Sequence, residues 1–237
     1  MSENKRGFLG KIMGLVTSPR GVFTGIEEID LKRGIAVILV IAVLSGWAGM
    51  TYFTKTGLQL PGMGSSSGGF SGHNPMFSPG AQDSSGIDPG TLRSRLTPFI
   101  AIGGMIGTVT RWLVPSILVL FAANIWVGKG SSKRMLAMTG FASAPRIVQQ
   151  ILRVIDAYTI SAADLASLTA TQGVSSGLLG RLVNQAFAVF NLFGVLTIVL
   201  TAVAVSVNYE ATPRKAAYVT VLAYIVYMIL RVYLPII

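Results

Sequence analysis

Residues 34–53 read GIAVILVIAVLSGWAGMTYF, and this stretch decides the fold class of the chain. It contains 20 residues and no ionised side chain. About 20 apolar residues in a helix are enough to cross the hydrocarbon core of a bilayer. The stretch starts too far from Met1, and is too long, to be the apolar core of a cleaved signal peptide. It therefore predicts a transmembrane helix.

Four further apolar stretches follow, at residues 98–127, 135–155, 183–207 and 216–237. Hydrophobic residues make up 51% of the chain and charged residues 12%, about half the charged fraction of an ordinary soluble domain. We therefore expect an all-α membrane bundle of five transmembrane helices over residues 34–237. Because the stretch 98–127 is long and contains Arg111 and Pro115, it fits one tilted or kinked helix, or an interfacial piece followed by a span.

The segments outside the spans have two different characters. Residues 54–97, between the first two spans, are dense in Gly, Ser and Pro, and predict a flexible external loop. Residues 1–33 predict a cytoplasmic N-terminal segment that contains an interfacial amphipathic helix. Two interpretations of this segment stay open. It packs under the bundle as a lid, or it contacts the membrane surface or a protein partner through five residues, which are Phe8, Lys11, Ile12, Pro19 and Phe23.

Basic residues set the expected orientation in the membrane. Lys32 and Arg33 precede the first span. A second cluster, from Lys129 to Arg134, joins the second and third spans, and Arg214 and Lys215 join the fourth and fifth. Cytoplasmic loops carry an excess of such residues. We therefore expect a multi-pass protein of the cell membrane with a cytoplasmic N-terminus and an external C-terminus. The formal net charge of +10 follows from these clusters, so we do not expect a nucleic-acid partner.

Three arginines, Arg111, Arg146 and Arg153, lie inside or at the ends of two of the apolar stretches, and no stretch contains a carboxylate. A charged side chain at mid-membrane costs about 3 kcal/mol, so each arginine needs a partner. Asp156 is the nearest acidic residue, three positions after Arg153. Because Arg146, Gln149, Gln150 and Arg153 recur at helical spacing, they share one helix face.

Guanidinium groups pair well with phosphate. We therefore expect a ligand site for a phospholipid headgroup or another anion between the second, third and fourth spans. Its residues are Arg111, Arg146, Gln149, Gln150, Arg153, Asn184 and Asn191. An alternative is that the arginines extend to the interface, or bond to backbone carbonyls freed by Pro115 and Pro145.

The residue types limit the chemistry that the chain can carry out. No span contains a histidine, a cysteine or a pair of carboxylates, so we expect no catalytic residues, no metal site and no cofactor. The preferred function is a non-enzymatic membrane organiser or adaptor that binds lipid. A cytoplasmic protein partner and a homo-oligomer remain open. The alternative function is a transporter or channel for a small solute or anion through the same polar residues.

Several short motifs occur in a characteristic order along the chain. They are Ser18-Pro19-Arg20 followed by Phe23 and Ile26, Gly128-Lys129-Gly130, Gly140-Phe141-Ala142-Ser143-Ala144-Pro145, and the link from Glu210 to Ala216. Together with the five expected spans, they make the chain resemble the YIP domain family, the Ypt/Rab-interacting membrane proteins, from about Leu15 to Tyr233. The eukaryotic members are similar to trafficking factors that bind prenylated Rab GTPases. Because the acidic aromatic motif of their cytoplasmic arm is missing, this chain looks like a prokaryotic member.

Overall fold

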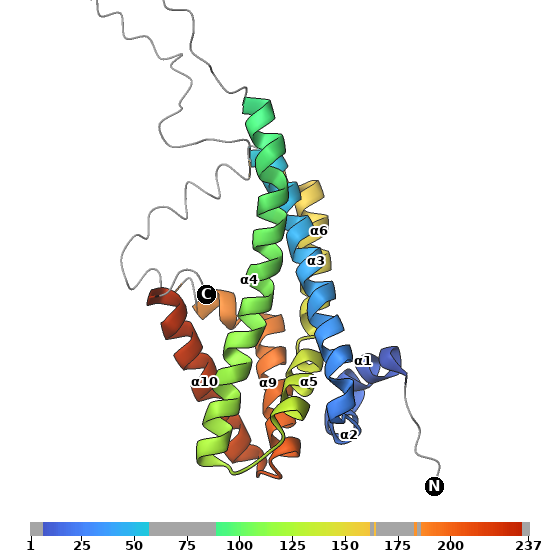
Figure 1. Ribbon diagram of the computed structural model, residues 1–237, viewed down its shortest axis with the longest axis vertical. Coiled ribbons are helices and arrows are strands. Elements are labelled where there is room, and N and C mark those ends of the chain that lie inside the picture. The colour runs from blue at the N-terminus through green and yellow to red at the C-terminus, as the bar shows by residue number, and fades with distance from the viewer. Residues whose placement is uncertain (1–6, 57–88, 162–163, 165–182, 184–185, 234–237) are drawn as a thin grey trace, which may run out of the picture.

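The computed structural model describes residues 7–56, 89–161 and 186–233, together with residues 164 and 183. Within these ranges the chain is helical and contains no strand, which confirms the all-α prediction. The helices form an elongated bundle along which α4 runs from end to end (Figure 1). In chain order the elements are α1 (Phe8–Thr17), α2 (Pro19–Thr24), the 3-10 helix η1 (Glu28–Asp30), α3 (Leu31–Thr56), α4 (Pro89–Trp126), α5 (Ser132–Ala142), α6 (Pro145–Thr159), α9 (Leu192–Asn208) and α10 (Pro213–Tyr233).

Three helices of the described part are long and apolar enough to cross a membrane. They are Glu28–Lys55, Ser94–Trp126 and Pro213–Tyr233, which correspond to the first, second and fifth expected spans. The second is one continuous helix, so it is not divided into two pieces. It begins at Pro89, inside the segment expected to be an external loop. Residues 57–88 of that loop lie outside the described residues.

The third and fourth expected spans are each interrupted. The stretch 135–155 is divided into α5 and α6 at Ser143 and Ala144, because Pro145 lacks the N–H group that would continue the helix ladder and starts a new helix instead. The stretch 183–207 bends at residues 190–191, and α9 contains 17 residues, slightly fewer than the ~20 that a perpendicular span needs. Neither stretch is therefore one unbroken helix.

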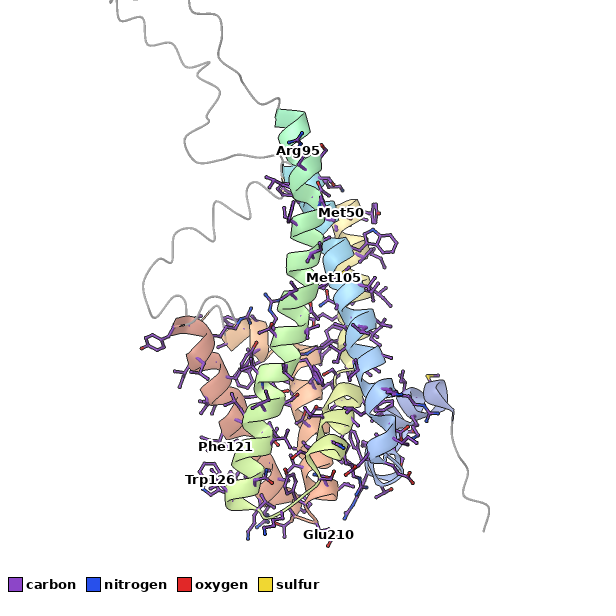
Figure 2. The ribbon with its side chains drawn as sticks, in the orientation of Figure 1. Met50, Arg95, Met105, Phe121, Trp126 and Glu210 are labelled. Carbon is purple, nitrogen blue, oxygen red and sulfur yellow. The ribbon has the colours of Figure 1, made fainter. Side chains whose placement is uncertain are left out.

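The surface of the bundle is rich in large apolar side chains, as expected for a protein surrounded by lipid. Phe121 and Trp126 on α4 are 66% and 57% exposed, and Figure 2 shows them pointing outward near the end that carries Glu210. Inside, Phe141, Met138 and Val119 are fully buried. The exposed apolar residues suit contact with lipid, while the core packs between α3, α4, α5 and α9.

One end of the bundle gathers the links that carry the basic clusters, and we call it the basic end (Figure 1). The Arg134 Nε group donates a hydrogen bond to the Ile26 carbonyl at 2.8 Å, and the Asn208 Nδ2 group donates to the Ser131 carbonyl at 3.2 Å. Gly128 has a φ of 143°, which strongly favours glycine. A Cβ atom on Gly130 would lie 2.7 Å from Asn208 Nδ2. This turn therefore requires glycine at both positions.

The N-terminal segment packs against the basic end. Phe23 and Ile26 have no exposed surface, and Ile12 packs against the core. The Lys11 ammonium group forms an ion pair with Asp30 at 2.7 Å, and the side chain of Lys11 is only 12% exposed. Pro19 is partly exposed, and the side chain of Phe8 lies outside the described part. Phe23 and Lys11 are thus held inside the fold.

Candidate functional site

A cavity of about 110 Å³ lies where α4, α6, α10 and the start of α9 meet. Six of the seven predicted ligand residues line it, and the seventh, Asn184, lies outside the described residues. The full lining is Ile41 from α3, Thr108 and Arg111 from α4, Arg146, Gln149, Gln150 and Arg153 from α6, Ala188, Val189, Asn191 and Gly194 from the segment that enters α9, and Tyr227 and Arg231 from α10.

The two faces of α6 explain why its polar residues turn inward. Val148, Ile151, Leu152 and Ile155 are 51%, 44%, 51% and 54% exposed and form the outer face. The four polar residues of α6 occupy the opposite face at i, i+3, i+4 and i+7. Because an apolar face is stable against lipid and a charged one is not, the sequence of α6 dictates that its arginines face the cavity.

The cavity carries a strong excess of positive charge. Four arginines line it, namely Arg111, Arg146, Arg153 and Arg231, and no carboxylate does. Within the described ranges, none of the four guanidinium groups has a hydrogen-bond or ion-pair partner. Like charges that line one cavity repel one another. Arg146 and Arg231 are half-buried, whereas Arg111 and Arg153 are exposed at the surface of the bundle. The arrangement therefore favours a bound anion.

The partner that the sequence suggested for Arg153 is engaged elsewhere. No ion pair joins Arg153 to Asp156 among the described residues. Instead the Asp156 carboxylate accepts a hydrogen bond from the Tyr52 hydroxyl, which comes from α3. Asp156 thus ties α6 to α3 and leaves the charge of Arg153 unanswered, so the expected i, i+3 pair is not formed.

The backbone around Pro145 does not use the arginines either. The Phe141 carbonyl, which a proline at position 145 would leave unpaired in a continuous helix, accepts a hydrogen bond from the Ala144 N–H group at 2.9 Å. The Ser143 N–H group bonds to the carbonyls of Thr139 and Gly140 at 3.2 Å. The helix break therefore satisfies its own carbonyl groups locally, and Arg146 is not needed for that purpose.

Two neutral features add to the polar lining. Gln150 is only 7% exposed, and its Oε1 atom has no hydrogen-bond partner among the described residues. Asn191 is the N-cap of α9, and its side chain accepts a hydrogen bond from the Gly194 N–H group at 2.9 Å. The N-terminus of a helix carries a partial positive charge. The start of α9 therefore adds to the positive potential of the cavity.

A second hollow of about 360 Å³ adjoins the first. The two share Gln149, Arg153 and Asn191 as lining residues, so they lie next to one another between α6 and the start of α9. The remaining lining of the second hollow consists of Leu152, Asp156, Leu192 and Phe193. Leu152 and Leu192 are 51% and 70% exposed. The polar cavity thus lies beside an open hollow at the surface whose lining combines exposed apolar residues with the Asp156 carboxylate.

Arg231 is the main residue of the cavity that sequence reasoning missed. It lies inside the fifth apolar stretch, where no carboxylate balances it, so the argument made for Arg111 and Arg146 would have identified it. Two neutral residues were also missed. Tyr227 lies four positions before Arg231 and Thr108 three positions before Arg111, and these spacings place them on the same helix faces as the arginines.

A comparison with protein-family models decides the family. The model of the Yip1 domain matches residues 13–234, nearly the whole chain. The chain belongs to the Yip1 domain family. Yip1 domain proteins are non-enzymatic membrane proteins, and the apolar helices described above agree with a membrane location. No curated protein and no solved structure matches the chain.

The motifs that suggested the family have defined places in this Yip1 domain protein. Gly128 and Gly130 form the tight turn at the basic end, and Phe23 is fully buried in the core. Residues 140–145 form the end of α5 and the break before α6. Because Arg146 follows this break directly, the motif determines where α6 begins and so where its polar face points. No group of three or more metal-ligating side chains occurs among the described residues.

Proposed function

We propose that this Yip1 domain protein organises membrane or acts as an adaptor, and that it binds a phospholipid headgroup in the arginine cavity. The observation that carries the proposal is the set of four arginines, from α4, α6 and α10, that line one cavity with no carboxylate. Arginine binds phosphate through paired, charge-assisted hydrogen bonds. A headgroup phosphate supplies the negative charge that the lining of this cavity does not.

The distances along the helices support a site that lies inside the bilayer and closer to one interface than to the other. Arg111 lies 15 residues before Trp126 on α4, which corresponds to about 22 Å of helix. Trp47 lies six residues beyond Ile41 on α3, or about 9 Å. The sum of about 31 Å between these two exposed tryptophans is close to the thickness of the hydrocarbon core, and tryptophans favour membrane interfaces. The cavity would then lie nearer to the interface opposite the basic end.

We further propose a five-span topology with the basic end in the cytoplasm. In this topology α5 and α6 together form the third span, and the residues from 186 to Asn208 form the fourth. The N-terminus is then cytoplasmic and the C-terminus external. The concentration of basic links at one end of the bundle supports this arrangement, as does the hydrogen-bonding of the N-terminal segment to Arg134.

Thiol labelling tests this topology, because the chain contains no cysteine. We expect Arg95→Cys to react in intact cells with a maleimide that cannot cross the membrane, since residue 95 lies at the end opposite the basic end (Figure 2). Lys129→Cys should react only after the membrane is opened. Labelling of Lys129→Cys in intact cells would reverse the orientation, and labelling of both variants would contradict the five-span count.

The N-terminal segment is the proposed contact with the membrane surface or with a protein partner. Met13 and Ile29 are 74% and 80% exposed, which is unusual for large apolar residues next to basic clusters unless lipid or a partner covers them. Phe23 and Lys11 support this surface from inside the fold. A second copy of the chain is a further candidate partner.

Transport of a small anion is the second candidate function, because the polar residues do surround one cavity. Between the cavity and the basic end, however, the core contains Met138, Phe141 and Val119, which are fully buried. In the described part of the chain, these side chains fill the core on the basic side of the cavity, next to the buried hydroxyl groups of Ser116 and Thr139. The arrangement therefore favours binding over conduction.

Native mass spectrometry of the detergent-purified protein tests the headgroup site. We expect wild-type protein to retain anionic phospholipid, and Arg111→Lys and Arg146→Lys to retain about tenfold less, because lysine loses one charge-assisted hydrogen bond of about 1.5 kcal/mol to the phosphate. Arg214→Lys is the matched control, since Arg214 is exposed at the basic end. Equal retention by all four proteins would contradict the site.

A further inference from the structure

The donors that line the arginine cavity specify the class of phosphate that the site takes, an inference that rests on the proposed function. We propose that the ligand carries a terminal phosphate, a doubly charged monoester like the headgroup of phosphatidic acid, and that Tyr227 donates a hydrogen bond to it. Its terminal oxygens are bound by arginines from three helices, which are Arg111, Arg146 and Arg231.

Tyr227 is the uncharged donor of this site. Its side chain lines the cavity and is 3% exposed, and it lies four positions before Arg231 on the same face of α10. Its hydroxyl group forms no hydrogen bond within the part of the chain that the structure describes. The hydroxyl oxygen nevertheless keeps some accessible surface, unlike the fully buried and unpartnered hydroxyl oxygen of Tyr209. The Tyr227 hydroxyl group is therefore open to the cavity and can donate to a ligand.

The three arginines approach the cavity from different sides. Arg111 comes from α4, Arg146 from α6 and Arg231 from α10. A guanidinium group binds phosphate best through two parallel hydrogen bonds, which require a pair of oxygens. A phosphate monoester has three terminal oxygens, and these form three such pairs, whereas a diester has two free oxygens and forms one pair. A monoester can therefore satisfy all three arginines, and a diester cannot.

The charge of the lining also fits a doubly charged ligand. Arg111 experiences the repulsion of the other three arginines, and no lining residue of this cavity is acidic. Asp156 lines the neighbouring hollow, three positions after Arg153 on α6, so its carboxylate offsets mainly the charge of Arg153. A phosphate monoester carries up to about two negative charges near pH 7, and it therefore offsets more of the remaining repulsion than a diester does.

A lipid is the expected source of this phosphate. Arg111 is exposed at the surface of the bundle and lies in α4, an apolar helix long enough to cross a membrane. The site is therefore open on a surface that suits contact with lipid, where phosphatidic acid of the same bilayer has a high effective concentration. Glycerol 3-phosphate and inorganic phosphate carry the same terminal phosphate group, so competition with these solutes distinguishes the two sources.

Native mass spectrometry from nanodiscs that contain equal amounts of phosphatidic acid and phosphatidylglycerol tests the class of phosphate. We expect wild-type protein to retain phosphatidic acid preferentially at about pH 7.5, where the monoester is doubly charged. Tyr227→Phe, which removes only the hydroxyl group, should retain about tenfold less phosphatidic acid, the effect of one hydrogen bond to a charged group. Tyr218→Phe is the matched control on the same helix, because Tyr218 is 77% exposed and lies outside the lining. Size-exclusion profiles and melting temperatures establish that both variants remain folded.

The pH dependence separates a doubly charged ligand from a singly charged one. The second proton of a phosphate monoester binds with a pKa of about 6, so the ligand loses one negative charge when the pH falls from about 7.5 to about 5. The preference of wild-type protein for phosphatidic acid should disappear over this range. Retention of phosphatidylglycerol from nanodiscs without phosphatidic acid should stay constant. An equal preference for phosphatidic acid at both pH values would contradict binding of the doubly charged form.

Glycerol 3-phosphate or inorganic phosphate at millimolar concentration should leave the bound phosphatidic acid in place. Displacement by either solute would overturn a lipid as the source of the phosphate. Equal retention of the two lipids by wild-type protein would overturn the monoester while leaving the headgroup site intact. Equal retention of phosphatidic acid by wild type and Tyr227→Phe would overturn the role of Tyr227. If wild-type protein retains neither lipid, both the inference and the proposed function fail.

Discussion

Asp30→Ala should release the N-terminal segment from the bundle. Asp30 is 2% exposed, and its carboxylate binds the Lys11 ammonium group and the Arg33 guanidinium group, each at 2.7 Å. It also accepts a hydrogen bond from the Glu27 N–H group at 3.2 Å. Removal of one partner of a buried ion pair costs about 3–5 kcal/mol, because the other charge stays buried without compensation. Here that charge is Lys11.

Hydrogen–deuterium exchange of the full-length protein measures this effect. A loss of about 3 kcal/mol should accelerate exchange of the amides of α1 roughly 100-fold, while exchange in α9 stays unchanged. Arg33→Gln is the matched control, because the Arg33 side chain is 54% exposed and exposed pairs contribute about 0–1 kcal/mol. Protection of α1 that survives Asp30→Ala would mean that apolar contacts alone hold the segment.

Gly140→Ala should strongly destabilise the bundle by forcing α5 away from α3. A Cβ atom on Gly140 would lie 2.6 Å from the Gly34 carbonyl oxygen and 2.8 Å from its Cα atom. Both are backbone atoms, so no side-chain rotation relieves the clash. Overpacking of this kind costs about 1–3 kcal/mol or more. Since α5 leads directly into α6, the polar face that carries Arg146 should move as well.

The melting temperature in detergent tests this contact, with Gly107→Ala as the matched control. Gly107 lies in the middle of α4, and a Cβ atom there would meet nothing within 4 Å. Alanine favours helix over glycine by about 1 kcal/mol, so we expect Gly107→Ala to melt at the wild-type temperature or above it. Gly140→Ala should melt clearly lower and retain less lipid. Equal melting of the two variants would mean that the α3–α5 contact is not a determinant of stability.

Two features of the fold could be predicted from the sequence, namely the first long apolar helix and the polar face of α6. The stretch 34–53 has no proline and no charge, and it forms a single helix, α3. The recurrence of Arg146, Gln149, Gln150 and Arg153 placed all four on one helix face, and the structure brings that face to a cavity. The helical spacing of these residues is sufficient to predict which face of α6 turns inward, because the opposite face is apolar and faces outward.

The interruptions of the third and fourth stretches were harder to predict, because they depend on tertiary contacts. Residues 183–207 are predominantly apolar and contain no proline, yet the chain bends before α9, where Asn191 caps the helix. A Cβ atom on Gly194 would lie close to the Val189 carbonyl oxygen, so this bend depends on a glycine that composition alone does not distinguish from the others. Arg231 is different, because it lies inside the fifth apolar stretch without a carboxylate, so the argument used for Arg111 and Arg146 applies to it equally.

A cryo-EM structure of the protein in nanodiscs that contain anionic phospholipid tests the central claim most directly. We predict density for a phosphate group between Arg111, Arg146 and Arg231. An arginine cavity without such density, in a map that resolves the surrounding side chains and the annular lipids, would contradict the headgroup site.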